Sequence, residues 1–460
     1  MVVDEDGALA GVLTDGDIRR ALLNDIAPHE PVEHVMQTDC VSLPIGAHPD
    51  EIHRALNDRI LFVPLVDDER KPVDYASHRR HRRFPVAEPL LDGNEAEYLL
   101  ECVRTGWISS QGPFVKSFET AVAAFHRMPF ALAVSNGTSA LHLALMSLGI
   151  GPGDEVIVPD LTFAATASAV VHSGATPVLV DVDRETWTLD LDAAERAATD
   201  RTRAIIPVHL YGHPCDMERL MAFARTRQLA VIEDVAEAFG ARSHGKLVGT
   251  FGDAACFSFY GNKTLTTGEG GMLLLRDETF YERAALLRDH GMSPRRRYWH
   301  LEAGFNYRLT NLQAAIGVAQ MERVETILRR KRALGDWYGA ALSELRGVVT
   351  PPRAVWADPV CWLYTVRIDE EIGLTRSELA GRLLINGIET RPVFEPLHRM
   401  PAFERFAGDG AFPITEELSS TGLSLPSAVT LEESDVEAIS AHIRAIVRVR
   451  QMHVATGGTA

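Results

Sequence analysis

The chain has 460 residues, of which 46% are hydrophobic and 24% charged, proportions typical of a globular protein with two or three domains. Acidic residues outnumber basic ones by 63 to 46, and the resulting net charge of −17 repels a nucleic-acid backbone, which excludes nucleic acid as an expected partner. No run of 18 apolar residues is present that could span a bilayer, so no membrane association is expected.

The N-terminus and the cysteines indicate a reducing compartment. The first residues, MVVDEDG, are acidic where a secretion signal would be basic, so the expected location is the cytoplasm. The five cysteines are odd in number, scattered and without a C-x-x-C pair: Cys40, Cys102, Cys215, Cys256 and Cys361. This pattern favours reduced thiols over disulfides or a zinc site. His209 and His213 lie beside Gly and Pro, so no helix aligns them as metal ligands, and no metal is expected.

Residues 1–76 contain two units of similar pattern. The stretch VVDEDGALAGVLTDGDIRRALL (2–23) predicts a strand, an Asp-Gly turn, a second strand and a helix that begins at a Thr/Asp cap. The stretch PDEIHRALNDRILFVPLVDDERKP (49–72) predicts another helix, a strand and a polar turn. The basic sequence SHRRHRR follows, and because its like charges resist packing we predict a linker over 77–84.

From residue 85 to 330, apolar runs alternate with amphipathic helical stretches. These runs are FALAVSN (130–136), EVIVPD (155–160), TPVLVDV (176–182), RAIIPVHL (203–210), LAVIEDV (229–235), AACFSF (254–259) and GGMLLLR (270–276). Nearly continuous apolar runs of this kind predict a mostly parallel sheet buried on both faces, in a large α/β domain.

The rest of the chain predicts a smaller α+β domain over 331–453. Helical patterns at 331–345, 375–388 and 431–450 flank a strand pattern, WLYTVRI, at 362–368. The last residues, 454–460, are small and polar and predict a disordered tail.

One lysine, Lys263, lies in the segment CFSFYGNKTLTTGEGGMLL (256–274) among aromatic, glycine and hydroxyl residues. An apolar pocket formed by Phe257, Phe259 and Tyr260 would lower the pKa of the lysine, and a free amine there could form a Schiff base. The alternative is a lysine that extends to solvent from the end of a strand.

Three further motifs follow predicted strands. Glu233 and Asp234 end the strand LAVIEDV, where carboxylates face the ligand crevice of an open α/β sheet; a structural cap is the alternative. The sequence NGTS (136–139) opens a helix whose free N–H groups and hydroxyls could hold an anion, although every helix needs a cap. Phe163 follows another strand and could lie against a planar ring, or pack in the core.

A lysine, a carboxylate, a phosphate cradle and an aromatic plate are the groups that pyridoxal 5′-phosphate requires. In order and wording these motifs resemble the DegT/DnrJ/EryC1/StrS sugar aminotransferases, of pyridoxal-phosphate fold type I, over residues 85 to 450. The resemblance is carried by GWISSQGPFVKSFE, NGTSALHLAL, PVHLYGHPCDM, EDVAEAFGA, FSFYGNKTLTTGEGG and GFNYRLTNLQAAIG.

The resemblance implies the roles of the site residues. Lys263 would be the Schiff-base lysine, and Asp234 the partner of the pyridine nitrogen. Phe163 would stack on the ring, and Glu237 lies where family members often carry Gln or His near the phenolic oxygen, so it needs a proton or a donor nearby. The implied phosphate contacts are Gly137, Thr138, Ser139, Ser258 and, reaching the neighbouring subunit's cofactor, Asn306. That last contact implies a homodimer with active sites at the interface.

The resemblance also implies the reaction. A related sugar dehydratase replaces the lysine with histidine, whereas this chain keeps Lys263, which favours transamination from L-glutamate to a nucleotide-linked 4-keto-6-deoxysugar. The motif wording is most similar to members that aminate C4 of GDP-4-keto-6-deoxymannose for surface polysaccharide (O-antigen, lipopolysaccharide). The candidate substrate contacts are Ser109, His290, Tyr307, Arg308 and Arg391, the last of which could also form a structural ion pair.

Two alternatives stay open at this point. One is a UDP-4-keto-6-deoxysugar 4-aminotransferase, of the bacillosamine or legionaminic acid type. The other is a catalytically idle regulatory protein that senses adenine nucleotides through its N-terminal part.

That N-terminal part resembles CBS domains, in which the Thr and Asp of GVLTDGD, here Thr14 and Asp17, contact an adenosine ribose. The first repeat lacks its front half, and the second stops before its own closing helix. We therefore expect a partial CBS module that does not bind nucleotide, and a true start codon upstream of Met1.

Overall fold

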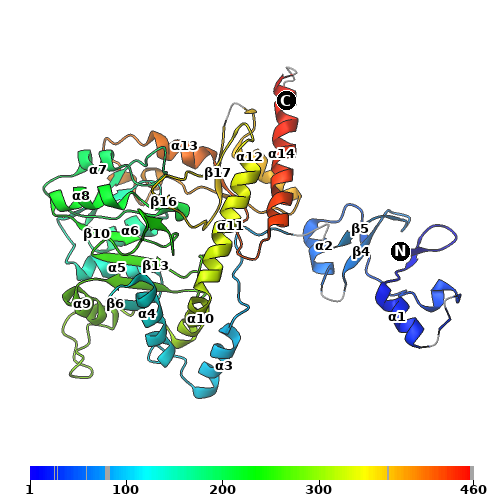
Figure 1. The fold of residues 1–460 in the computed structure, drawn as a ribbon, viewed down its shortest axis with the longest axis horizontal. Helices are drawn as coiled ribbons and strands as arrows, with labels where there is room; N and C mark the ends of the chain where they lie inside the picture. Colours follow the sequence, from blue (N-terminus) through cyan, green and yellow to red (C-terminus); the bar gives the residue numbers. More distant parts are fainter. Residues whose placement is uncertain (25, 28, 58–59, 78–82, 370–371, 456–460) are drawn as a thin grey trace. The chain divides into compact units, whose positions relative to one another are not determined.

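The computed structural model describes residues 1–460 except 25, 28, 58–59, 78–82, 370–371 and 456–460. The chain forms two compact units (Figure 1). One comprises Met1–Phe84 and Gly381–Glu389, and the other Pro85–Ala380 and Thr390–Ala460. Most of the linker predicted at 77–84, and most of the tail predicted at 454–460, lie outside the described residues.

The N-terminal unit has the predicted strand, turn, strand and helix. β1 (Val2–Val3) pairs antiparallel with β2 (Leu9–Gly11), and α1 (Asp15–Leu23) begins at a capping box formed by Thr14 and Asp17. A second part comprises β3 (Leu43–Pro44), α2 (Pro49–Ala55), β4 (Phe62–Val66) and β5 (Pro72–Ser77). Its small core consists of Ile52, Leu56, Val63, Leu65 and Ala76.

The larger unit is built on a seven-stranded sheet of order β6-β14-β13-β10-β9-β7-β8. The strands are β6 (Phe130–Val134), β7 (Glu155–Pro159), β8 (Thr176–Val180), β9 (Thr202–Ile205), β10 (Ala230–Asp234), β13 (Ala254–Ser258) and β14 (Gly271–Leu275). All pairs are parallel except those of β14, which is antiparallel to both neighbours. The seven predicted strands and the mostly parallel sheet are confirmed.

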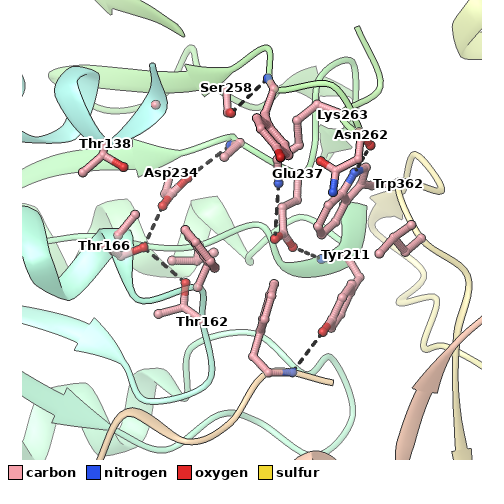
Figure 2. Close-up of a pocket in the computed structure, with 18 of the residues that line it drawn as sticks. Thr138, Thr162, Thr166, Tyr211, Asp234, Glu237, Ser258, Asn262, Lys263 and Trp362 are labelled. Atoms are coloured by element: carbon pink, nitrogen blue, oxygen red, sulfur yellow. Dashed lines mark hydrogen bonds and ion pairs between the residues drawn. The ribbon is translucent and has the colours of Figure 1, made fainter. Parts of the chain in front are cut away.

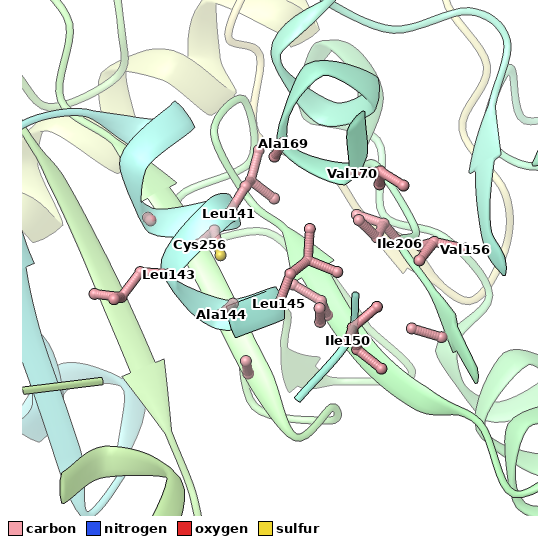
Figure 3. Close-up of a cluster of buried hydrophobic side chains, with 14 of the residues drawn as sticks. Leu141, Leu143, Ala144, Leu145, Ile150, Val156, Ala169, Val170, Ile206 and Cys256 are labelled. Atoms are coloured by element: carbon pink, nitrogen blue, oxygen red, sulfur yellow. The ribbon is translucent and has the colours of Figure 1, made fainter. Parts of the chain in front are cut away.

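Both faces of this sheet are buried, as the continuous apolar runs predicted. Along β13, Ala254 and Cys256 belong to one hydrophobic core, and Ala255 and Phe257 to another on the opposite face. Helices of the first core are α5 (Gly137–Ser147), α6 (Ala165–His172) and α9 (Glu278–Arg288), and Figure 3 shows α5 side chains packed in it. Helices of the second are α4 (Pro113–His126), α10 (Asn311–Glu322) and the start of α11 (Val324–Leu342).

The remaining elements include a second, antiparallel sheet of order β15-β17-β19-β18. Its strands are β15 (Val348–Val349), β17 (Thr365–Ile368), β18 (Arg391–Pro392) and β19 (Gly422–Ser424). The other elements are α3 (Glu95–Thr105), α7 (Leu191–Ala197), α8 (Met217–Arg227), α12 (Arg376–Ile385), α13 (Pro413–Thr421), α14 (Glu433–Ala455), β11 (Arg242–Ser243), β12 (Lys246–Leu247) and β16 (Ala357–Asp358).

Helix α11 is longer than predicted, because it begins at Val324 and passes through the boundary expected between 330 and 331. The division into domains at 85–330 and 331–453 stays a prediction. None of the helices formed by the described residues is both long and apolar enough to cross a membrane.

Candidate active site

A cavity of about 450 Å³ opens where several parallel strands end. Asp234 is the last residue of β10, Ser258 the last of β13, and Phe163 follows β7. This is the edge at which open α/β sheets bind ligands. Eight residues predicted from the sequence line the cavity: Gly137, Thr138, Phe163, Asp234, Glu237, Ser258, Lys263 and Arg391. Figure 2 labels Thr138, Asp234, Glu237, Ser258 and Lys263 among them.

The Lys263 amine lies between a carboxylate and an aromatic ring. Its Nζ is 3.7 Å from Glu237 Oε1 and 3.6 Å from the centre of the Trp362 ring, and only 13% of the side chain is exposed. Burial lowers the pKa of the lysine, and the charges of Glu237 and Asp234 oppose that shift. The predicted apolar surroundings of this amine are therefore present, although Trp362 rather than the preceding aromatic residues contacts it.

Asp234 is a buried carboxylate held by two hydrogen bonds. Thr166 Oγ1 donates to its Oδ2 at 2.8 Å, and the Ala236 N–H donates to its Oδ1 at 3.1 Å. Burial raises the pKa of Asp234, and these two hydrogen bonds act in the opposite direction. Thr162 in turn contacts Thr166, with 3.2 Å between the two hydroxyl oxygens. The carboxylate is thus fixed in direction and can hold a protonated ring nitrogen.

Glu237 is also buried, with 4% of the residue exposed. The Tyr211 N–H donates to its Oε2 at 2.8 Å, while its Oε1 faces Lys263. Burial raises the pKa of Glu237 from 4.5 to about 7, and the neighbouring lysine limits the rise. A carboxyl group with this pKa can hold or release a proton near neutral pH. The Tyr211 N–H is one donor of the kind that the sequence required near Glu237, and the role of this residue toward the cofactor stays a prediction.

The N-terminus of α5 forms one end of the cavity. Asn136 is its N-cap and accepts a hydrogen bond from the Ser139 N–H at 2.8 Å. A Cβ on Gly137 would lie 3.0 Å from the Ser258 Cβ, so a larger residue would crowd the approach of the helix to β13. With Thr138 and Ser258 supplying hydroxyls, this helix end can bind a phosphate. Ser139 does not line the cavity; its hydroxyl is 3.1 Å from that of Ser135.

Aromatic side chains that the sequence analysis missed form one wall. The Tyr211 ring stacks on the rings of Trp362 and Phe394, with 5.9 Å and 5.5 Å between ring centres. The ring centres of Phe394 and Phe163 are 5.9 Å apart. Phe163 itself is 60% exposed and free to face a planar ligand. Tyr211 lies in the quoted motif PVHLYGHPCDM, and Phe394 lies three residues after the candidate contact Arg391, which were the available signals. Nothing near Trp362 in the sequence indicated its place.

Besides Ser139, five predicted contacts do not line this cavity: Ser109, His290, Asn306, Tyr307 and Arg308. Arg308 forms an ion pair with Asp289 at 2.9 Å and donates to Asn306 Oδ1. The Tyr307 hydroxyl lies 3.0 Å from His142 Nδ1. The roles given to these residues in the sequence analysis stay predictions.

Comparison with known proteins identifies the family. The sequence pattern of the DegT/DnrJ/EryC1/StrS aminotransferase family matches residues 89–444. The chain belongs to that family. The pattern of the CBS domain matches residues 1–24, which confirms the resemblance for that segment, and the extent of the module to residue 76 stays a prediction.

The similar proteins include GDP-perosamine synthases and solved aminotransferases. The GDP-perosamine synthase of Caulobacter vibrioides is 50% identical over 360 residues, covering 78% of this chain and 97% of that protein. The enzyme of the same name from Escherichia coli O157:H7 is 46% identical, covering 77% of this chain and 95% of that protein. The crystal structure of DesV from S. venezuelae superposes with a TM-score of 0.72 at 37% identity, covering 77% of this chain and 94% of that one.

Family and fold together establish the chemistry in general terms. The protein is a sugar aminotransferase with the pyridoxal-phosphate type I fold, and pyridoxal 5′-phosphate is its cofactor. The cavity fits this group, because it combines a buried amine whose pKa is lowered by its burial, a buried carboxylate, a helix N-terminus with hydroxyls and an exposed aromatic ring. The predicted fold, cofactor and enzyme class are confirmed.

Proposed function

We propose that the protein transfers the amino group of L-glutamate to C4 of GDP-4-keto-6-deoxymannose and so forms GDP-perosamine. The observation that carries this proposal is the 50% identity to a GDP-perosamine synthase across 97% of its length. We place the reaction in the cytoplasm, in the synthesis of surface polysaccharide of the O-antigen type.

The residues of the cavity divide the work of such a reaction. Pyridoxal phosphate supplies an aldehyde that binds amines and a ring that accepts electrons. Lys263 Nζ would bind the aldehyde and, when released from it, could carry a proton to and from the substrate carbon. Asp234, fixed by Thr166, would hold the proton of the ring nitrogen. Phe163 would cover the ring, and the α5 N-terminus with Thr138 and Ser258 would hold the phosphate.

Glu237 gives the cavity a carboxyl group that can donate a proton. Its Oε2 is engaged by the Tyr211 N–H, so its Oε1 is the oxygen directed at Lys263. We propose that this oxygen would hold a proton for the cofactor's phenolic oxygen. Among the cavity-lining residues the only cations are Lys263 and Arg391, and we assign Arg391 to a carboxylate or phosphate of the substrates.

We further propose a homodimer in which Asn306 reaches the partner's cofactor phosphate. Asn306 and Arg308 contact each other outside this chain's own cavity, which supports a role in a second copy. The test is to mix a Lys263→Ala chain with an Asn306→Ala chain. Shared sites predict that mixed dimers regain one functional site, whereas independent sites predict no activity above that of the separate variants.

The product assay tests the substrate. The protein, pyridoxal phosphate and glutamate are incubated with GDP-4-keto-6-deoxymannose or with a UDP-4-keto-6-deoxysugar, and the products are identified by mass. Amination of the GDP-sugar alone supports the proposal, and amination of the UDP-sugar alone replaces it with the alternative. No product from either, together with no visible absorption band from bound cofactor, would favour an idle regulatory protein.

For the N-terminal unit we propose that no adenine nucleotide binds. Thr14 Oγ1 donates to Asp17 Oδ2 at 2.6 Å, and Gln37 Nε2 donates to Asp17 Oδ1 at 3.1 Å. The two groups expected to hold a ribose are therefore already engaged with the chain itself. Equilibrium dialysis with labelled AMP and ATP tests this, and saturable binding would contradict it.

A further inference from the structure

Helix α11 buries a lysine that pairs with no carboxylate among the described residues and whose acidic neighbour is the Cys361 thiol. Lys331 is 4% exposed, and its Nζ donates to the carbonyl oxygens of Trp362 at 2.8 Å and Ser427 at 2.5 Å. Across the described part of the chain, no carboxylate oxygen lies within 4 Å of this amine. Burial lowers the pKa of Lys331 to about 8. Burying an amine without a carboxylate partner costs free energy. Packing alone therefore does not explain why a lysine occupies this position.

The first hydrogen bond leads to the active-site lysine through one residue. Lys331 fixes the main chain of Trp362, and the Trp362 indole N–H donates to the Asn262 carbonyl oxygen at 2.8 Å. Asn262 directly precedes Lys263, whose Nζ lies 3.6 Å from the indole ring centre. Figure 2 shows the indole of Trp362 beside Asn262 and Lys263 at the wall of the cavity. Trp362 is therefore held by three contacts, at its backbone carbonyl oxygen, its indole N–H and the face of its ring.

The two lysines also border one small space. Lys263 and Lys331, with Glu88, Asn262 and Thr264, line a gap of about 10 Å³, which is at the lower limit for holding one water molecule. Lys331 and the segment that carries Lys263 are therefore close neighbours in space as well as linked through Trp362.

We propose that Lys331 is a positioning residue that holds the Trp362 indole over the Lys263 amine and thereby sets the direction and protonation of that amine. An indole face attracts an ammonium group, so the ring favours the charged form of Lys263. The other charges that face this amine are Glu237 and Asp234, which favour the same form, and Arg391, which disfavours it. The proposal rests on the cofactor-binding role proposed for Lys263, but its test does not require that role.

The test measures the Lys263 amine in the full-length, cofactor-free protein. Amines are acetylated competitively between pH 6 and 10, and peptide mapping gives the pKa of Lys263 from its labelling profile. We expect Lys331→Met and Trp362→Leu each to lower that pKa by about 0.5 to 1.5 units, the value of a lost indole contact. The double variant should shift it no further, because both changes break the same link.

The matched control is Tyr338→Phe. Tyr338 lies on the same helix and is fully buried, and its hydroxyl donates to the Pro426 carbonyl oxygen at 2.9 Å, next to Ser427. This change removes a buried hydrogen bond to the same segment but leaves Trp362 tied, so the Lys263 profile should match the wild type.

Three results would overturn the proposal. A higher pKa in Lys331→Met would mean that the two amines act on each other by direct repulsion. Equal shifts in Tyr338→Phe would mean a general loosening of the segment. An unchanged Lys263 labelling profile in Trp362→Leu would show that the indole does not act on the Lys263 amine, which refutes the proposal. This variant provides the test if Lys331→Met does not fold. The product assay is separate, so failure of the proposed substrate would leave these outcomes readable.

Discussion

The buried carboxyl group of Glu237 makes the stability of the protein depend on pH in a defined direction. Its pKa rises from 4.5 in the unfolded chain to about 7 in the fold, so between these values the folded state holds more protons than the unfolded one. The stability that this proton confers is fully present below pH 4.5 and is lost as the pH rises through 7. A difference of about 2.5 units corresponds to about 3 kcal/mol.

Glu237→Gln should remove this dependence. A neutral amide oxygen can still accept from the Tyr211 N–H, so the variant and the wild type should be similarly stable at pH 5. At pH 8 the variant should have the higher free energy of unfolding, by up to about 3 kcal/mol. The measurement is urea unfolding of the cofactor-free wild type and variant at half-unit steps from pH 5 to 8, which gives the free energy of unfolding of each at every pH.

Glu155→Gln is the matched control. Glu155 is also buried, but hydrogen bonds from Thr199 and Arg201 outweigh its burial and lower its pKa. Its contribution is present above pH 4.5 and lost only as the pH falls below that value. The free energy of unfolding of Glu155→Gln should therefore lie below that of the wild type by the same amount at every pH from 5 to 8. Parallel curves for Glu237→Gln and the wild type would refute the reasoning.

Three further substitutions test the site. Lys263→Ala should lower turnover by about 10³-fold or more. Treatment of this variant with pyridoxal phosphate and borohydride should label no residue of the cavity, and labelling of the peptide that contains position 263 would contradict the role of Lys263. Thr166→Val removes the 2.8 Å hydrogen bond to Asp234 and should cost about 1 to 3 kcal/mol of stability in thermal unfolding, with Ser as the conservative control. Gly212→Ala should cost more than about 2 kcal/mol, because Gly212 has a φ of +96° and a Cβ would lie 1.6 Å from the Val360 carbonyl oxygen; unchanged stability would show that this loop adjusts freely.

Much of the fold was readable because its signals are local. The seven apolar runs became the seven strands, since a strand buried on both faces needs apolar residues at every position. The cap at NGTS became the N-terminus of α5, since a helix start depends on a few neighbouring residues. The start of α11 was misplaced because the residues before 331 continue the same helical pattern, and only packing fixes where the helix begins.

The sequence by itself determined the α/β pattern and pointed to the residues that meet at the cavity, because Lys263, Asp234 and the α5 cap each stand in a distinctive local motif. Only the tertiary structure decided what surrounds them. Trp362 reaches Lys263 from about a hundred residues away, and Lys331 reaches Trp362 from a different element again. Periodicity and capping depend on neighbours along the chain, whereas the meeting of such distant side chains depends on how helices and sheets pack.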